Sequence, residues 1–422
     1  MPISIKRDRS KPTAGLRNAV RAVVFFLGLC VIITILSRIF ERKTSAQMYD
    51  VFFETKEDVD VLFLGTSHMS NAVLPLQLMQ EQGFSSFNLA GHGNQLATTY
   101  WVLVNALDYA DPQVVVLDLS YLGENQKTSL VSVNQTHTAL DAIPFSMNKV
   151  RMVDDLFDTT QEKAEFLADF LIYHDRWAEL SAEDFESRTI TYRGAAPGFA
   201  VAEPIVTEKI SREDCCEPDT VGVEYLNRIM TLCRERGIEV VWTYLPFPAD
   251  EEKQREANLG YVLAEEYGVP YLNFLDLDVV DLEVDCLDAS SHLNLSGAVK
   301  CTRYLGEFLA ENFNLPDRRG EAEYACWGEE LTAYTQAITG LLLVDQTDPY
   351  KSLMLLVDPN IHAGVTVCGE QSAIEDPKLR KLLDQASAYQ TVEYDTEGAG
   401  YLLRIDVRDS DGNSYGEVVY TR

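Results

Sequence analysis

The apolar stretch from Ala19 to Phe40 constrains this chain more than any other feature of the sequence. Its 22 residues include sixteen in succession, from Ala22 to Ser37, that carry no charge. At about 1.5 Å per residue, a helix of this length extends ~33 Å, which is enough to cross a hydrocarbon layer about 30 Å thick. Arg21 and Arg38 lie where their side chains can reach the two interfaces. We therefore expect a single transmembrane anchor over residues 19–40.

The net charge of −31 is divided unevenly along the chain. Residues 1–43 contain nine basic and two acidic side chains and carry +7, so the remainder carries −38. Basic residues ahead of the anchor predict a cytoplasmic tail over residues 1–18 and place the acidic bulk outside the cytoplasm. A cleaved signal peptide is the alternative, since Thr44, Ser45 and Ala46 supply small residues, although charged side chains separate them from the apolar run. The acidity excludes a nucleic-acid partner, because phosphate backbones are bound by Lys and Arg.

The eight cysteines indicate neither a zinc site nor a disulfide scaffold. Cys30 lies in the apolar stretch, and the seven others are an odd number that cannot all pair within one chain. No C-x-x-C occurs, and the adjacent Cys215 and Cys216 do not have a usual zinc spacing. We expect buried thiols with one or two bridges of open connectivity, and no metal or other cofactor.

A length of 422 residues suggests two or three folded units, and the first alternates strands with helices. Apolar runs of strand length occupy residues 59–64, 87–90, 114–119, 239–245 and 271–275, and helical patterns occupy 95–109, 221–236, 250–267 and 296–313. Buried strands joined by helical crossovers imply a parallel sheet covered on both faces. We predict an α/β fold with a three-layer α/β/α sheet over residues 50–318, interrupted by a helical insertion over about 123–218.

A second boundary follows at the polar residues 316–320. Beyond it, strand-like runs occupy residues 341–345, 353–358, 391–394, 401–407 and 415–420, with a helix over 377–386. Asp411 and Gly412 supply a hairpin-type turn between the last two runs. These patterns predict a small C-terminal α+β domain over residues 330–422.

Candidate catalytic residues follow the predicted strands, because loops at the carboxyl edge of a parallel sheet converge on ligands. Ser67 comes directly after the first strand, where a strand-to-helix turn exposes the hydroxyl group. A serine needs a base to remove its proton, and His292 follows the fifth strand at the same edge. Asp288, four residues earlier, could orient the imidazole. The alternatives are an N-capping serine and a loop histidine with a structural hydrogen bond.

The segment from Asn88 to Gln95 follows the second strand and offers oxyanion donors. Gly91 and Gly93 allow close approach of backbone N–H groups, and the side chain of Asn94 or Gln95 can donate to the same point. A turn that only begins a helix is the alternative. A dinucleotide-binding fingerprint needs a third glycine at a fixed spacing, and this segment lacks it.

Further candidate substrate contacts are His68 and Gln95 beside these blocks, and the group His174, Arg176 and Trp177 in the predicted insertion. The latter group could hold an anionic or sugar ring, with the indole stacking on it. The competing interpretation of His68 is structural support for the nucleophile. That of His174, Arg176 and Trp177 is a salt-bridged helix end.

The segments 61–68, 88–95 and 288–297 together resemble the SGNH (GDSL-like) hydrolase superfamily. More narrowly, with 173–177 and 315–319, the chain is similar to membrane-anchored extracytoplasmic SGNH-like proteins of bacteria that work beside membrane-bound O-acyltransferases. The resemblance covers about residues 50–320. It implies an SGNH, flavodoxin-like sheet with Ser67 as nucleophile, His292 as base and Asp288 as its partner. Gly91 or Gly93 with Asn94 would form the oxyanion site.

The resemblance further implies a serine esterase or O-acyltransferase acting on an acylated cell-envelope polysaccharide, such as a teichoic-acid-like polymer. Two features depart from the family pattern. Ala289 stands where the family usually has its aspartate, one residue after Asp288, and the third strand is followed by Ser120 and Tyr121 instead of a Gly-x-Asn-Asp block. These departures favour the alternative, a non-catalytic accessory protein that binds an envelope polymer or a membrane O-acyltransferase. A lipase-like esterase is a third interpretation, which the acidic bulk does not favour.

Overall fold

A computed structural model of the chain describes residues 14–40, 49, 51–53, 58–129, 131–168, 170–185, 192–344, 347–370, 374–398 and 400–421. The described residues belong to two compact units. The first unit takes in Met1–Thr44 and Phe157–Ser187, and the second takes in Ser45–Leu156 and Arg188–Arg422. Residues 1–13 of the expected basic tail and the alternative cleavage site at residues 44–46 lie outside the described residues.

The first unit is built on α1 (Ala14–Phe40). Its segment Arg17–Ser37 is long and apolar enough to cross a membrane by length and composition, and none of it is buried. The expected N-terminal apolar helix is thereby confirmed. The same unit contains α8 (Thr160–Leu167), α9 (Phe170–Tyr173) and the short 3-10 helices η1 (His174–Ala178) and η2 (Ala182–Phe185). Among these, α9, η1 and η2 pack against α1.

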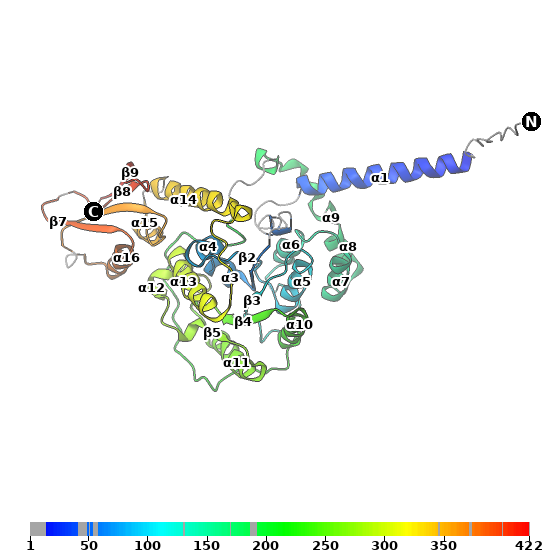
Figure 1. The fold of residues 1–422 in the computed structure, drawn as a ribbon, viewed down its shortest axis with the longest axis horizontal. Coiled ribbons are helices and arrows are strands. Elements are labelled where there is room, and N and C mark those ends of the chain that lie inside the picture. The colour runs from blue at the N-terminus through cyan, green and yellow to red at the C-terminus, as the bar shows by residue number, and fades with distance from the viewer. Residues whose placement is uncertain are drawn as a thin grey trace, which may run out of the picture. The chain divides into compact units, whose positions relative to one another are not determined.

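The second unit contains a five-stranded parallel sheet with the order β2-β1-β3-β4-β5 (Figure 1). Its strands are β1 (Val61–Leu64), β2 (Ser86–Asn88), β3 (Val114–Asp118), β4 (Glu239–Tyr244) and β5 (Tyr271–Asn273). Phe63 of β1 lies opposite Asn88 of β2 and Val116 of β3. Every residue of β1 and β3 is buried, which explains their uninterrupted apolar sequences. The predicted α/β class and parallel sheet are confirmed.

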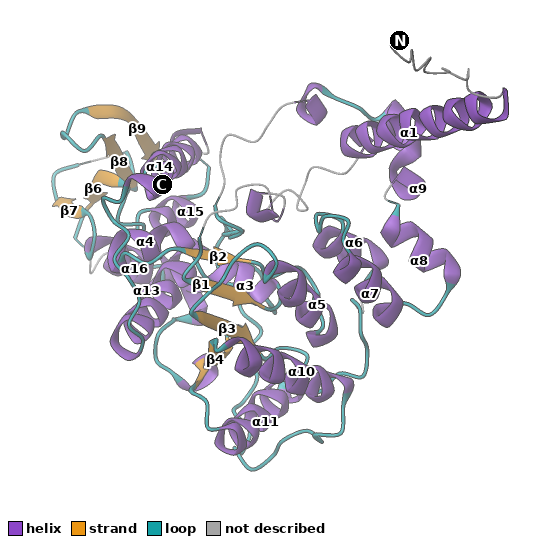
Figure 2. Ribbon diagram, turned by 45° about the vertical axis from the view of Figure 1, so that its right-hand side comes forward, coloured by secondary structure: helices purple, strands orange, loops and turns teal. Residues whose placement is uncertain are grey.

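Helices cover both faces of this sheet (Figure 2). On one face α13 (Leu295–Asn312) packs against α3 (Ser67–Ala72) and α4 (Pro75–Gln82), and on the other α5 (Leu96–Ala106) packs against α10 (Val221–Arg236). The helix between β4 and β5 is α11 (Glu251–Tyr267). The chain between β3 and α10 is helical at α6 (Val133–Leu140) and α7 (Met147–Leu156) before it enters the first unit.

The C-terminal part forms a second, four-stranded sheet with the order β7-β6-β8-β9. Its strands are β6 (His362–Cys368), β7 (Thr391–Asp395), β8 (Leu403–Arg408) and β9 (Ser414–Tyr420), and its helices are α14 (Cys326–Val344), α15 (Pro349–Leu355) and α16 (Pro377–Ser387). The predicted strands 391–394, 401–407 and 415–420 and the predicted helix are present. The strands expected over 341–345 and 353–358 are wrong, because the first of these runs ends α14 and the second lies in α15 and the turn after it. A short apolar run does not by itself distinguish a strand from a buried helix.

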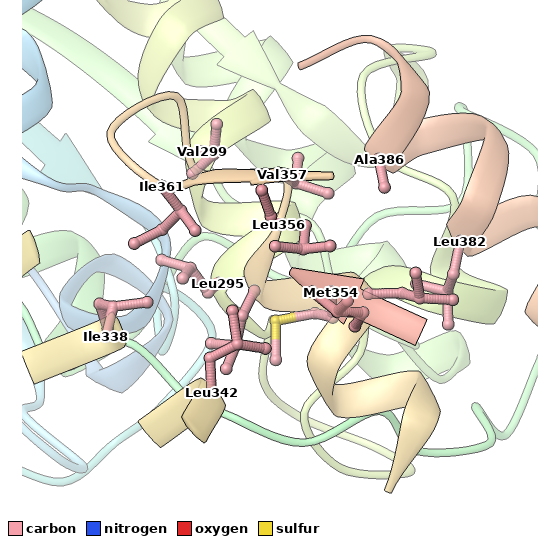
Figure 3. Close-up of a cluster of buried hydrophobic side chains, with 14 of the residues drawn as sticks. Leu295, Val299, Ile338, Leu342, Met354, Leu356, Val357, Ile361, Leu382 and Ala386 are labelled. Carbon is pink, nitrogen blue, oxygen red and sulfur yellow. The ribbon is translucent and has the colours of Figure 1, made fainter. Parts of the chain in front are cut away.

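One hydrophobic core joins the C-terminal helices and sheet to the α/β part (Figure 3). Leu295 and Val299 of α13 contribute to the same buried cluster as Leu342 of α14, Met354 of α15 and Leu382 of α16. The predicted C-terminal segment therefore lies in the same compact unit as the parallel sheet.

A buried arginine ties the edge of the parallel sheet to α14. The Arg193 guanidinium donates to Glu330 at 2.6 and 2.7 Å and lies over the Trp327 ring at 4.1 Å. The backbone carbonyl of Arg193 accepts the N–H of Asn88, the last residue of β2, at 2.9 Å. The side chain of Arg193 is only 2% exposed, so Glu330 compensates a charge that is almost entirely removed from water.

We expect Glu330→Ala to lower the free energy of unfolding by about 3 kcal/mol, because it leaves the Arg193 guanidinium buried without its carboxylate partner. Urea unfolding of the full chain in detergent micelles measures the change. The matched control is Glu329→Ala on the exposed face of the same helix, with an expected effect of about 0.5 kcal/mol or less. Equal effects of the two substitutions would contradict this prediction.

Candidate active site

The turn after β1 presents Ser67 as the first residue of α3. Gly65 has a φ of +145°, and a Cβ atom there would lie 2.5 Å from the Cβ of Asp118 on β3, so only glycine fits. Thr66 caps the helix, because its Oγ1 accepts the His68 N–H at 3.2 Å. The same hydroxyl donates to Asp118 Oδ2 at 2.9 Å. Two neighbouring strands therefore fix the position from which the Ser67 side chain projects.

The side chains of Ser67, His292 and Asp288 form one hydrogen-bonded chain. Nε2 of His292 lies 2.8 Å from Oγ of Ser67, and its Nδ1 lies 2.5 Å from Oδ2 of Asp288. The His292 side chain is 25% exposed and that of Asp288 is 40% exposed, so solvent reaches the group. The structure thus brings together the three residues that the sequence proposed as nucleophile, base and orienting carboxylate.

The Asp288 carboxylate also organises the loop that carries His292. Its second oxygen, Oδ1, accepts the backbone N–H groups of Ser290 at 3.0 Å and Ser291 at 2.7 Å. Leu287 N–H donates to the His292 carbonyl at 2.8 Å, which closes the loop. This turn accommodates the four-residue spacing from Asp288 to His292, with Ala289 inside it. One carboxylate oxygen holds the backbone while the other holds the imidazole.

The surroundings keep Asp288 ionised. Burial by itself raises the pKa of this carboxyl, but hydrogen bonds from His292 and from the N–H groups of Ser290 and Ser291 outweigh burial and lower the pKa below its usual value. Asn294 follows the loop and caps α13 by accepting the Gly297 N–H at 3.3 Å. The base is consequently held between a tight turn and a capped helix.

Some of the predicted oxyanion donors already donate a hydrogen bond within the protein, and others do not. Gly91 N–H donates to the Gly65 carbonyl at 3.0 Å, so it is engaged in joining the glycine segment to the nucleophile turn. The Asn94 side chain is beside it, since a Cβ on Gly91 would come within 2.7 Å of Asn94 Nδ2. Gly93 has a φ of +68° and faces the side chains of Ser129 and Gln135. The Asn94 backbone N–H donates to the Gly91 carbonyl at 3.1 Å. Within the part of the chain that the structure describes, the Ser67 N–H and the Asn94 side-chain NH₂ have no acceptor.

His68 is held next to the nucleophile by stacking and by a hydroxyl group. Its ring lies parallel to that of Phe247, with centroids 4.1 Å apart, and 5.8 Å from the His292 ring. Its Nδ1 lies 3.0 Å from Oγ of Ser120, and that hydroxyl donates to Asp118 Oδ1. Since Ser120 donates to the carboxylate, it accepts from His68, which assigns the proton to Nδ1 and leaves Nε2 as an acceptor.

The environment of His68 keeps the ring neutral. Burial, followed by the positive charges of His292 and Lys253, lowers the pKa of His68 to about 3, against a smaller opposing effect of Asp288. His92, half-buried on the glycine segment, also has a lowered pKa, caused by burial and by the charge of His292. A third neighbour, Gln95, is fully buried, and its side-chain amide has no partner among the described residues.

The remaining predicted contacts lie in the other compact unit. Arg176 donates to Asp184 at 3.0 Å and to the backbone carbonyl of Phe40 at the end of α1. Trp177 is 69% exposed, and His174 is exposed as well. These three residues thus belong to the first unit, whereas Ser67 belongs to the second.

Sequence reasoning missed several residues that shape the site. Phe247 follows β4 at the same edge as Ser67, and the rule that located Ser67 would have found it. It also lines a cavity of about 140 Å³ together with the apolar side chains of Val206, Ile210, Leu275 and Leu282. Asp118 was visible as a carboxylate that ends a buried strand, but its contact with Thr66 required the strand order.

The described cysteines are all free thiols, so the expected one or two bridges are absent from this structure. Within the described ranges, no group of three or more His, Cys, Asp or Glu side chains is placed to hold a metal ion.

Comparisons with models of known protein families and with curated proteins find no match to this chain.

We expect the stability of the protein to fall as the pH decreases from about 6.5 towards 3, in part because of His68. The unfolded chain binds a proton on this ring near pH ~6.5, whereas the folded protein does not until about pH 3. This one group contributes a loss of at most ~1.4 kcal/mol per pH unit over that interval. Thermal unfolding across this pH range should give a shallower profile for His68→Phe than for the unmodified protein.

The control is His362→Phe, which removes an exposed imidazole on β6. A pH profile of His68→Phe that coincides with that of the unmodified protein would contradict the prediction.

Proposed function

We propose that this protein is an SGNH-type serine esterase or O-acyltransferase, anchored by α1 with its acidic bulk outside the cytoplasm, that acts on an acylated cell-envelope polysaccharide. The observation that carries the proposal is the hydrogen-bonded chain from Ser67 through His292 to Asp288 at the carboxyl edge of a parallel sheet. Nucleophile, base and orienting carboxylate in this order are the minimum equipment for acyl transfer through a serine ester.

The distances support a two-step reaction. Nε2 of His292 accepts the proton of Ser67 as Oγ forms a bond to the ester carbonyl carbon. The ester C–O bond then breaks, and the protonated imidazole gives its proton to the departing alkoxide oxygen, which leaves an acyl group on Ser67. Asp288 accepts the Nδ1–H throughout and stabilises the imidazolium. In the second step the oxygen of a water molecule or a sugar hydroxyl bonds to the acyl carbon while His292 removes its proton. The bond between the acyl carbon and Oγ of Ser67 then breaks, and the imidazolium returns the proton to Oγ.

Charge that develops on the carbonyl oxygen needs donors at fixed positions. The Ser67 N–H is suited to this role, because the first N–H groups of a helix have no partner within the helix. The Asn94 amide is a second donor beside Gly91. Together they would replace the asparagine that the family usually supplies after the third strand, where this chain uses Asp118 to hold Thr66.

Neutral His68 favours an acceptor or leaving group that carries a hydroxyl. Its Nε2 is a hydrogen-bond acceptor one residue from the nucleophile, and its low pKa keeps it in that state at neutral pH. A polysaccharide provides hydroxyl donors on every ring. This feature supports a sugar ester as the substrate. It supports transfer of the acyl group to a sugar hydroxyl as much as it supports hydrolysis.

One observation favours the alternative of a non-catalytic accessory protein that binds an envelope polymer or a membrane-bound O-acyltransferase. The Gly91 N–H, which the resemblance assigns to the oxyanion site, is taken by the Gly65 carbonyl. An accessory protein would keep the fold as a binding surface without turnover. Labelling of the serine distinguishes the two functions.

We expect a fluorophosphonate probe to label the full chain on Ser67, because Nε2 of His292 lies within proton-transfer distance of Oγ. Ser67→Ala should abolish labelling, and mass spectrometry should place the adduct on Ser67 in the unmodified protein. Ser387→Ala, an exposed serine at the end of α16, is the control and should label normally. A folded protein that fails to react would overturn the catalytic proposal and leave the accessory function.

Asp288→Asn should lower the rate of labelling and of p-nitrophenyl acetate hydrolysis by about 10³–10⁴-fold without unfolding the loop. The asparagine oxygen can still accept the N–H groups of Ser290 and Ser291, but its NH₂ group cannot accept the Nδ1–H of His292. The control is Asp278→Asn, an exposed carboxylate before α12 (Leu282–Asp285). An unchanged rate in Asp288→Asn would show that this carboxylate does not orient the base.

A further inference from the structure

We propose that the segment 170–185 forms a collar at the end of α1 that lies in the headgroup region of a phospholipid bilayer, with Trp177 and Phe185 inserted among the lipids. The proposal rests on the anchoring of α1 that is part of the proposed function, and it goes beyond that function by naming a second membrane-contacting surface. It also gives the group around Arg176 a role other than substrate binding.

The collar packs on the last turn of α1. Side chains from Val20 to Ile35 are exposed, whereas those of Leu36, Ser37, Ile39 and Phe40 are half-buried, because α9, η1 and η2 lie against this end. The insertion therefore covers the helix only where it ends. The rest of its apolar surface stays uncovered in this unit, as lipid contact requires.

Arg176 fastens the collar to the helix end. Its guanidinium donates to the carbonyl of Phe40, one of the last carbonyls of α1, which have no partner within the helix. It also bonds Asp184 at 3.0 Å, and Asp184 in turn accepts the N–H of Ser181 at 2.8 Å. A cation at a helix C-terminus is favoured by the helix dipole, and Asp184 neutralises the charge that remains.

The length of α1 places this contact at a membrane interface. Phe40 is nineteen residues beyond Arg21, which corresponds to ~29 Å along a helix axis and matches a hydrocarbon layer about 30 Å thick. With the Arg21 side chain at one boundary, the contact between Arg176 and Phe40 lies at the opposite one. The collar is consequently at headgroup level.

The two aromatic side chains of the collar are exposed. Trp177 is 69% exposed and Phe185 66% exposed, and each belongs to a 3-10 helix that contacts α1. Tryptophan is enriched at membrane interfaces because its ring is apolar and its N–H remains in a polar region. The two rings lie beside the end of α1, whose apolar surface is exposed. A lipid bilayer that surrounds α1 therefore also contacts Trp177 and Phe185.

Fluorine NMR of the full chain tests the proposal directly. The protein is labelled with fluorotryptophan and incorporated into phosphatidylcholine nanodiscs, and the Trp177 resonance is assigned by its disappearance in Trp177→Phe. A nitroxide on the lipid chain near the headgroup should broaden this resonance more than a nitroxide at the chain terminus, and a water-soluble gadolinium chelate should broaden it weakly. The buried Trp101, Trp242 and Trp327 are internal references that none of the probes should broaden strongly.

A second variant, Phe185→Trp with Trp177→Phe, moves the probe to η2 and should give the same order of broadening. Broadening of the collar resonances by the gadolinium chelate alone would overturn the proposal, as would protection from all three probes, which would indicate a protein contact such as a second copy of this chain. Failure of the protein to enter nanodiscs would instead refute the anchoring, and fluorophosphonate labelling of Ser67 reports separately on the enzyme.

Discussion

The carboxylate of Asp288 is the interaction on which the geometry of the site depends. A single side chain binds the imidazole of His292 through one oxygen and the backbone of the following turn through the other. Ionisation serves both tasks, since a carboxylate accepts from several donors and those donors keep its pKa low. The position of the base is therefore coupled to the conformation of the loop, and the loop is coupled to the cap of α13.

A second carboxylate, Asp118, is fully buried and supports the turn that carries Ser67. Asp118 ends β3 and receives the hydroxyl groups of Thr66 and Ser120, and Ser120 in turn holds His68 beside the nucleophile. Burial raises the pKa of Asp118, against which the hydroxyl and backbone donors act. The end of β3 thus fixes the turn that carries Ser67.

The sequence was sufficient to predict the side chains that lie directly after the strands of the parallel sheet. Parallel topology brings loops of distant sequence position to one edge, so Ser67 and His292 could be paired without coordinates. The hydrogen bond of the Gly91 N–H could not be predicted, because its acceptor is the Gly65 carbonyl in the turn after another strand, β1. The location of Arg176 and Trp177 could not be predicted either, since nothing local in the sequence signals that an insertion packs on a helix more than a hundred residues earlier.

In the C-terminal part, hydrophobic periodicity predicted strands where the structure has helices, and it missed one strand. Leu341–Val344 is uniformly apolar and fits a strand or a helix equally well, and the pattern of burial along α14 resolves this only in the folded chain. The strand β6 was overlooked although Ala363, Val365 and Val367 alternate with more exposed residues. Histidine and glycine at its start obscured that alternation.

Burial protects two of the free cysteines from thiol–disulfide exchange. Cys233 and Cys286 are buried, and burial raises the pKa of each to about 12. Disulfide exchange proceeds through the thiolate, a form that these two side chains hardly populate at neutral pH. In the folded protein these two thiols therefore react slowly with disulfides and persist in the reduced form.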